Sequence, residues 1–198
     1  MDSRTIFQQL QTSEPSRLSD LPESFGLYAL WDHTTKIRYI GCTPKATEGF
    51  RTRIFNKHST GSEGRSHKFS QAYCTGRMWR YCKKLHPLSS FLEQDTADAD
   101  AAKKLRNAFI RKFCKATYVE IPTQDAPSSY FSYLTSLEAE IQSMAPASMR
   151  TWERIGFASL SEPSDLVDQL LIEFPTTKST VEKQNTIYMR HVHGAVAV

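Results

Sequence analysis

Two short runs near the start of the chain are rich in aromatic and β-branched residues, GLYALW at 26–31 and IRYIG at 37–41, and they flank a polar linker. A period of two is typical of β-strands, and the short polar linker between the runs predicts a hairpin. If the turn is centred just after His33, Tyr28 and Tyr39 lie directly opposite each other on one face. Tyrosine pairs of this kind often serve only as structural contacts in a sheet.

Apolar residues recur every three or four positions over much of the remaining chain, which predicts amphipathic helices. The expected helices cover a short stretch around Ile6 and Leu10 and residues 47–57, 68–85, 98–113, 127–144 and 164–174. The run KATYVEI at 115–121 predicts a third strand, whereas the end of the chain has no clear pattern. The sequence therefore predicts a protein that mixes helices and strands.

The chain of 198 residues is long enough to bury a core without a disulfide or a structural metal. Its four cysteines are too scattered for a typical zinc site, so we expect reduced, partly buried thiols. The N-terminus resembles neither a signal peptide nor a transit peptide, and no run approaches the roughly 18 to 20 apolar residues of a membrane span. We expect a cytoplasmic protein with no membrane partner.

Positive charge is concentrated in the middle of the chain. Between Lys45 and Lys84 there are ten lysines or arginines against Glu48 and Glu63, although the whole chain has a net charge of only +4. From Thr151 onward, four basic residues face six acidic ones, a net of −2. Aromatic residues lie among the basic ones, a mixture that suits phosphate contact and base stacking but also ordinary solvated helix faces. Nucleic acid is the leading candidate for a partner.

Four short motifs follow one another along the chain. They are Gly26-Leu27-Tyr28, Tyr39-Ile40-Gly41, Arg53-Ile54 on the next expected helix and Leu137-Glu138 on a later one. Their order and spacing resemble the GIY-YIG nuclease family over residues 24–150. The resemblance implies an α/β (α+β) module, a small three-stranded antiparallel sheet flanked by helices, with helical N- and C-terminal extensions at 1–23 and 151–198.

The resemblance also implies a reaction, the hydrolysis of DNA phosphodiester bonds with one divalent cation, Mg²⁺ or Mn²⁺. Tyr28 would orient or deprotonate the attacking water, and Tyr39 would support the nucleophile or the scissile phosphate. Arg53 would clamp the phosphate, Glu138 would bind the metal, and Gly41 would let the backbone approach the site. A single glutamate suffices, because Mg²⁺ is commonly held by one or two carboxylates with waters and phosphate oxygens. A phenol with a pKa of about 10 needs nearby positive charge to act as a base at neutral pH.

Two positions depart from the family pattern. A His or Tyr usually stands four residues after the arginine, but here Lys57 occupies that place and His58 follows it. One extra residue on a regular helix rotates the side chain by about 100°, so His58 is a candidate catalytic residue only if the helix ends or unwinds before it. The asparagine that often follows the later proline, Pro146 here, is missing, and Ser148 or Arg150 could take its role.

Candidate DNA-binding residues lie before, in and after the arginine helix: Lys45, Arg51, Lys57, Arg65, His67 and Lys68. We expect a metal-dependent endonuclease that acts on duplex DNA, either of the restriction type or from a phage or mobile element. A homodimer is expected if the enzyme cuts both strands. Two alternatives stay open, a nucleic-acid-binding module of the same fold that does not cleave and a nuclease that acts on RNA.

Overall fold

The structure is a computed structural model that describes residues 1–60, 68–80, 96–123, 127–154 and 160–193. The chain divides into two units, each built from two separated segments. The first unit contains Met1–Ser59 and Arg111–Ile155, and the second contains Thr60–Ile110 and Gly156–Val198. The expected division into 1–23, 24–150 and 151–198 follows the order of the chain instead. Among the described helices, no stretch combines the length and the hydropathy that crossing a bilayer requires.

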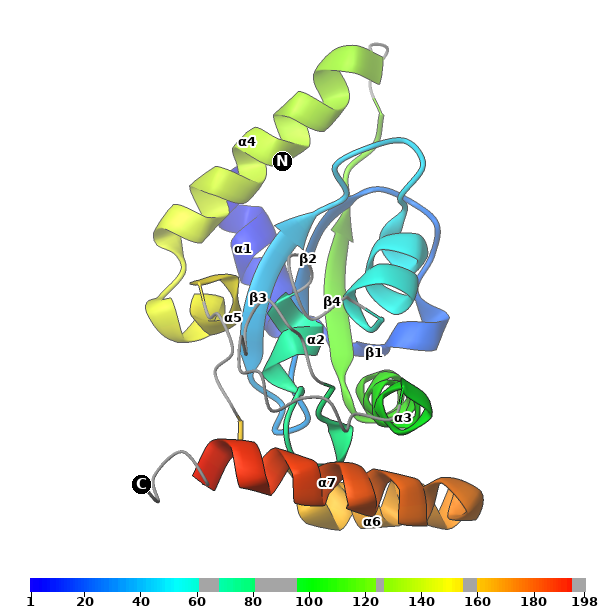
Figure 1. Ribbon diagram of the computed structural model, residues 1–198. Coiled ribbons are helices and arrows are strands. Elements are labelled where there is room, and N and C mark those ends of the chain that lie inside the picture. Colours follow the sequence, from blue (N-terminus) through cyan, green and yellow to red (C-terminus); the bar gives the residue numbers. More distant parts are fainter. Residues whose placement is uncertain (61–67, 81–95, 124–126, 155–159, 194–198) are drawn as a thin grey trace. The chain divides into compact units, whose positions relative to one another are not determined.

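A four-stranded antiparallel sheet organises the first unit (Figure 1), and the prediction of an α+β fold is confirmed. Its strands are β1 (Ser16–Arg17), β2 (Gly26–Trp31), β3 (Ile37–Cys42) and β4 (Lys115–Glu120). Their order across the sheet is β1-β4-β2-β3, so β3 forms one edge. The sheet has one strand more than expected because β1 pairs with β4. A two-residue strand is too short to show the alternation that would predict it.

The hairpin of β2 and β3 has a different register from the expected one. Tyr28 lies opposite Gly41 and Leu30 lies opposite Tyr39, so the prediction that the two tyrosines are directly paired is wrong. The two rings are instead diagonal neighbours on one face, with centroids 6.2 Å apart and planes inclined by 23°. The shift places Gly41, which has no side chain, across from Tyr28 and so leaves room for the tyrosine ring.

The connection between β2 and β3 explains the register. The backbone N–H of Asp32 donates to the carbonyl of Lys36 at 2.9 Å, which leaves three residues at the tip of the loop. Thr35 has a φ of 59°, and the pairing shifts next to Leu30, a geometry common in three-residue hairpin loops. The Asp32 carboxylate accepts hydrogen bonds from the backbone N–H groups of Thr34 and Lys36. A threonine in the left-handed region gave no sequence signal, since glycine or asparagine is usual there.

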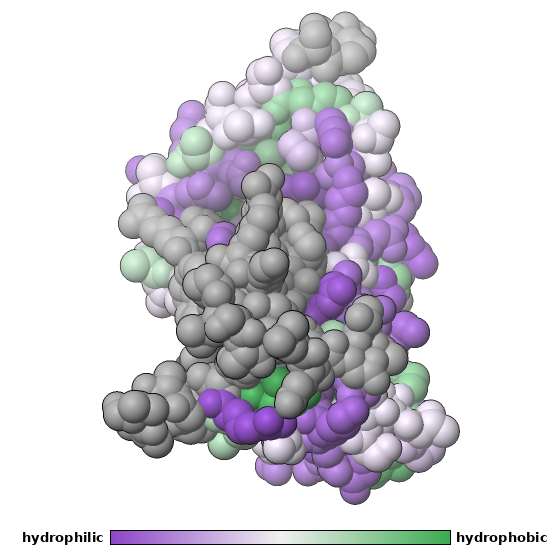
Figure 2. Space-filling model, in the orientation of Figure 1, coloured by the Kyte–Doolittle hydropathy of each residue, from purple (hydrophilic) through white to green (hydrophobic). Residues whose placement is uncertain are grey.

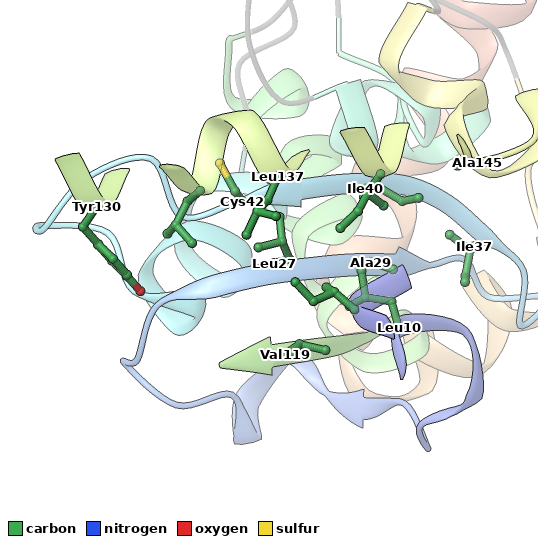
Figure 3. Packing of buried hydrophobic residues seen from close by; sticks show 13 residues of the cluster. Leu10, Leu27, Ala29, Ile37, Ile40, Cys42, Val119, Tyr130, Leu137 and Ala145 are labelled. Atoms are coloured by element: carbon green, nitrogen blue, oxygen red, sulfur yellow. The ribbon is translucent and has the colours of Figure 1, made fainter. Parts of the chain in front are cut away.

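One face of the sheet packs against two helices, α1 (Ser3–Thr12) and α4 (Pro127–Met144), and their contact forms the main core (Figure 3). The core includes Ile6, Leu10, Leu27, Ala29, Ile40, Cys42, Val119, Leu134, Leu137 and Ile141. The N-terminal helix, expected as an extension, is therefore part of this core. Asp2 caps it by accepting a hydrogen bond of 2.9 Å from the backbone N–H of Thr5.

The opposite face of the sheet carries aromatic side chains. Phe50 packs there against Tyr28 and Tyr118, with ring centroids 6.3 and 5.1 Å apart. The helix expected over 47–57 runs over Arg51–His58 and is a π-helix, in which backbone hydrogen bonds join residues five apart. This face therefore supports a helix that is wider than the regular one expected from the sequence.

Shorter helices lie elsewhere in the first unit: η1 (Leu18–Asp20), η5 (Ala147–Arg150) and α5 (Thr151–Arg154). Trp152 of α5 is buried, and the guanidinium of Arg38 lies 5.9 Å from the centre of its ring. This contact fastens the segment after α4 to strand β3. The described cysteines, Cys42, Cys74 and Cys114, are buried and form no disulfide with one another.

The second unit is helical in its described part. Its elements are α2 (Lys68–Ala72), η3 (Gly76–Met78), most of α3 (Thr96–Phe113), α6 (Ser164–Glu173), η6 (Pro175–Thr177) and α7 (Lys178–His193). A small core joins Cys74 and Trp79 to Ile187 of α7. The Arg77 guanidinium forms ion pairs with Glu162 and Asp168 and ties η3 to the segment around α6.

Two expectations for this unit are wrong. The helix expected over 68–85 ends at Ala72 in its described part, and the separate helix η3 begins at Gly76, whose φ is 52°. The end of the chain, which has no clear pattern, forms α7. Its buried face contains Gln184 together with Val181 and Ile187, so a polar residue interrupts the apolar period.

Candidate active site

The candidate catalytic residues come from four elements of the first unit. Tyr28 lies on β2, Tyr39 on the edge strand β3, Arg53 and His58 on the π-helix, and Glu138 on α4. The first four gather on the aromatic face of the sheet, and Glu138 lies where α4 borders the edge strand. The predicted set is therefore brought together from separate parts of the chain.

A hydrogen bond joins the two most buried members of this set. The Tyr28 hydroxyl lies 2.7 Å from Nε2 of His58, and the two residues are 0% and 2% exposed. Tyr39 closes the group, because its ring centroid lies 5.1 Å from that of His58. Three rings thus form one cluster with a polar contact at its centre.

The π-helix brings His58 into this cluster. The expectation was that His58 could contribute only if the helix ended or unwound before it. The helix instead continues to His58 and is widened, with the backbone N–H of Ser59 donating to the carbonyl of Ile54 at 3.2 Å. Because residues five apart are joined in such a turn, the turn carries His58 to the side of Arg53. Arg111 supports this end of the helix by donating to the Phe55 carbonyl and the Ser59 hydroxyl.

Gly41 leaves the room that the two tyrosines occupy. A Cβ at this position would lie 2.6 Å from the Tyr28 hydroxyl oxygen and 2.7 Å from a ring carbon of Tyr39. Any side chain here would displace at least one of these rings. The backbone of the second motif is therefore in close contact with the rings of Tyr28 and Tyr39.

Arg53 lies between the tyrosines and an acidic residue. Its Nη1 is 3.1 Å from Oε2 of Glu48, and its Nε is buried without a hydrogen-bond partner in the described part of the chain. Burial alone would lower the pKa of Arg53, but Tyr28, Tyr39 and Glu48 raise it above its ordinary value. The guanidinium is therefore a permanent cation, and its side chain is 24% exposed, so an oxyanion can reach it.

Glu48 is the site residue that the sequence did not single out. It counted only as one acidic residue within a basic stretch, yet its side chain is 2% exposed and contacts Lys45, Arg53 and Lys57. Burial would raise the pKa of Glu48, but these three cations lower it to about 2. Glu48 stands three residues after Lys45, five before Arg53 and nine before Lys57. These spacings do not predict the cluster, because the helix from Arg51 to His58 is not a regular α-helix.

Glu138 occupies the margin of α4, as its place beside the apolar stripe predicted. The Cys42 thiol donates to its Oε2 at 3.0 Å, and the Gln142 amide lies 3.3 Å from its Oε1. The same amide donates to the Ile40 carbonyl and so covers the edge strand. Burial raises the pKa of Glu138, although the Cys42 contact and the charge of Arg53 oppose this shift.

The chemistry of Glu138 fits the expected cation. A half-buried carboxylate near one arginine is stabilised by a bound divalent ion, which needs one or two carboxylates besides waters and phosphate oxygens. Within the described residues, no group of three or more His, Cys, Asp or Glu side chains could hold a metal ion. Glu138 is therefore a candidate for the single protein ligand of a cation that also binds the substrate.

The electrostatics of Tyr28 limit what it can do. Burial raises the pKa of Tyr28 well above 10, and Tyr39 adds to the rise, while Arg53 lowers it only in part. The phenol is therefore neutral at physiological pH. It can hold and orient a water molecule, and it can pass a proton to the imidazole with which it is hydrogen-bonded.

The predicted DNA-binding residues are distributed unevenly. Lys45 and Lys57 meet at Glu48, whereas Arg51 donates to the Ser19 carbonyl at 2.9 Å. Lys68 begins α2 in the second unit, and Arg65 and His67 lie outside the described residues. Hydrophilic side chains cover the side of the surface on which the π-helix and its preceding loop lie (Figure 2).

The segment after Pro146 offers a polar group that is already engaged. Arg150 donates from Nε to the Ala145 carbonyl at 3.1 Å, and Ser148 is exposed.

Comparisons with family models, curated proteins and solved structures find no match to this chain.

Proposed function

We propose that this chain is a divalent-metal-dependent endonuclease of the GIY-YIG type that hydrolyses DNA phosphodiester bonds. One observation carries the proposal: the hydrogen bond of 2.7 Å between Tyr28 and His58, beside Arg53. A buried phenol, an imidazole and a partly exposed guanidinium supply what hydrolysis of a phosphodiester needs, a proton acceptor and a positive charge for the pentavalent phosphate.

The proton of the attacking water would move along this hydrogen bond. Because Tyr28 is neutral, its hydroxyl can accept a proton from the water only as it gives its own proton to Nε2 of His58. The imidazole then carries the proton and Tyr28 is restored. Tyr39 and Gly41 keep the phenol in place, since both lie against its ring.

The charges around the phosphate would come from the chain and from the cation. Arg53 would donate to a non-bridging oxygen and stabilise the charge that develops there. Glu138 would hold Mg²⁺ or Mn²⁺, which supplies a Lewis acid to the phosphate oxygens when it is bound. Lys45 and Lys57 add positive charge beside Arg53 and favour the approach of DNA.

The substrate of this activity is duplex DNA in our proposal, and Lys45 and Lys57, which lie beside Arg53 in the same unit, support an anionic substrate. A homodimer or a larger assembly would cut both strands, since one site cuts one strand. We propose an enzyme of the restriction type or one from a phage or mobile element, and the cytoplasm is the compartment that we propose.

A nucleic-acid-binding module without cleavage is the second candidate. Two observations favour it: the burial that raises the pKa of Tyr28, and the engagement of Arg150 with a backbone carbonyl where the family has an asparagine. Such a protein would bind DNA with the same basic residues but would not need the Tyr28–His58 contact.

The test is cleavage of supercoiled plasmid and phage DNA by the purified protein in Mg²⁺ or Mn²⁺. EDTA and the variant Glu138→Gln serve as controls, and Glu140→Gln, an exposed glutamate on the same helix, is the matched variant. We expect discrete or nicked products that disappear with EDTA and with Glu138→Gln but persist with Glu140→Gln. Binding to several DNAs without any cleavage, in either metal, would establish the second candidate.

A further inference from the structure

A single buried carboxylate holds three basic side chains at the border of the site. Oε1 of Glu48 lies 2.8 Å from Nζ of Lys45 and also contacts Nζ of Lys57, while Oε2 lies 3.1 Å from Nη1 of Arg53. Three cations against one carboxylate leave an excess of two positive charges. The cluster is therefore neutralised only in part and still attracts phosphate.

The segment that carries Glu48 is fixed on both sides. A Cβ on Gly49 would lie 2.3 Å from the Glu23 carbonyl oxygen, and the backbone N–H of Phe50 donates to the Ser24 carbonyl at 3.0 Å. The backbone N–H of Arg53 donates to the carbonyl of Gly49 at 2.8 Å. Glu48 thus stands on backbone that is tied both to the entry of β2 and to the start of the π-helix.

We propose that Glu48 is a positioning residue, which holds the guanidinium of Arg53 and the ammonium of Lys57 in the orientation that the scissile phosphate requires. This inference rests on the proposed endonuclease activity. Glu48 binds Nη1 of Arg53, whose side chain is still 24% exposed, so one corner of the guanidinium is anchored while its exposed part can bind an oxyanion. Without the anchor, two long side chains would have to be ordered by the substrate itself.

The opposite role makes a different prediction. A carboxylate among cations could also occupy the place of a phosphate and compete with DNA. The substitution Glu48→Gln removes one negative charge, so electrostatics alone would tighten DNA binding in either case. Positioning and competition differ in their effect on the cleavage rate of the protein–DNA complex, because only the loss of a positioning residue lowers that rate.

The experiment measures the single-turnover cleavage rate and the dissociation constant for a cleavable duplex. For Glu48→Gln we expect the rate to fall roughly 10- to 100-fold, the loss that a small misplacement of a catalytic group can cause, with binding unchanged or tighter. Glu23→Gln is the matched control, because its exposed carboxylate bonds to Thr52 on the same helix but not to Arg53. Its rate should stay within about twofold of wild type, since rim charges mainly change association.

An unchanged or faster rate with Glu48→Gln would overturn the proposal, and so would a rate loss explained entirely by weaker binding. Glu48→Asp is the second variant, used if Glu48→Gln does not fold. It keeps the charge but withdraws the carboxylate by one methylene, so the rate should fall although the charge is unchanged.

A measurement without cleavage separates this inference from the proposed function. The ¹⁵N relaxation of the arginine Nε–H groups reports side-chain order, and the Arg53 signal is assigned by its absence in Arg53→Lys. We expect Arg53 to be ordered in the wild type and mobile in Glu48→Gln, with no change in Glu23→Gln. If the wild type cleaves no DNA, the proposed function fails, yet an equally ordered Arg53 in Glu48→Gln would still show that Glu48 does not position it.

Discussion

The Tyr28 hydroxyl and Nε2 of His58 lie 2.7 Å apart, although 30 residues separate them in the chain and both side chains are buried. Burial leaves the hydroxyl few alternatives to this bond, because a buried polar group without a partner is costly. The bond therefore fixes the orientation of both rings. In the proposed reaction it is also the path along which the proton of the attacking water moves.

Tyr28→Phe and His58→Asn should each lower the cleavage rate by about 10²- to 10⁴-fold, the usual contribution of a positioned acid or base. Since the two residues act as one unit, the double variant should be about as slow as the slower single variant. Single-turnover kinetics at saturating protein measures this. Additive losses would mean that the two side chains act in separate steps.

Deleting Asn56 should leave an active protein. The deletion puts the histidine four residues after Arg53 instead of five. Residues four apart lie on the same side of a regular α-helix, so the histidine can reach the position that His58 now reaches through the π-helix. We expect helical content to be retained by circular dichroism and cleavage to stay within about tenfold, provided that proximity is restored. An inactive but folded deletion variant would contradict the role given to the widened helix.

Gly41→Ala should damage both stability and activity. Its new Cβ would lie within 2.7 Å of atoms of both tyrosines, and overpacking of this kind typically costs about 1–3 kcal/mol. Urea unfolding measures the stability. Gly49→Ala is the comparison, because its Cβ meets the backbone of Glu23 rather than the tyrosines. At a temperature where both variants are folded, cleavage should fall further in Gly41→Ala.

Glu138→Gln should abolish cleavage without lowering stability at pH 8. Because burial raises the pKa of Glu138 above 4.5 in the folded state, the folded protein loses stability as the pH rises from that value through the raised pKa. The glutamine variant does not undergo this loss, so its Tm at pH 8 should equal or exceed that of the wild type. Added Mg²⁺ should raise the Tm of the wild type more than that of Glu138→Gln. A lower Tm for the variant would mean that the charged carboxylate stabilises the fold.

Glu48 should stabilise the fold in the opposite pH range. Its pKa falls from 4.5 to about 2 on folding, so its contribution is present above pH 4.5 and is lost as the pH falls through about 2. At pH 7 the difference in unfolding free energy between wild type and Glu48→Gln should be roughly 3 to 4 kcal/mol, since the pKa falls by about 2.5 and one pKa unit corresponds to about 1.4 kcal/mol. Urea unfolding at pH 7, 4 and 2.5 should show this difference shrinking. A difference that is constant with pH would exclude the ion pairs as its source.

The elements with a strong local pattern were predicted from the sequence. Strands β2, β3 and β4 and helices α1, α3, α4 and α6 carry their own alternation or apolar stripe, so periodicity was enough. Elements whose stability comes from other segments were not predicted. Strand β1 has only two residues and is defined by their pairing with β4. Helix α7 buries the polar residue Gln184, so a hydropathy pattern does not predict its buried face.

The candidate site shows the same division. Tyr28, Tyr39, Arg53 and Glu138 lie in short motifs, and the structure brings them to one place. The register of the hairpin, the widened turn before His58 and the burial of Glu48 depend on backbone geometry that short motifs do not encode. Thr35 in the left-handed region and the hydrogen bond from Ser59 to Ile54 decide these features.

The interleaved order of the two units has a consequence for how the chain folds. In the second unit, the ion pair of Arg77 with Glu162 joins residues 85 positions apart, and Thr75 meets Tyr188 over 113 positions. Long-range contacts form late, because the entropy of closing a long loop must be overcome before any of them forms. During synthesis, the first unit can close once residue 155 is free of the ribosome, whereas the second must wait for α7. Until then the η3 segment cannot bury Cys74 and Trp79, because the core that they share with Ile187 is not yet complete.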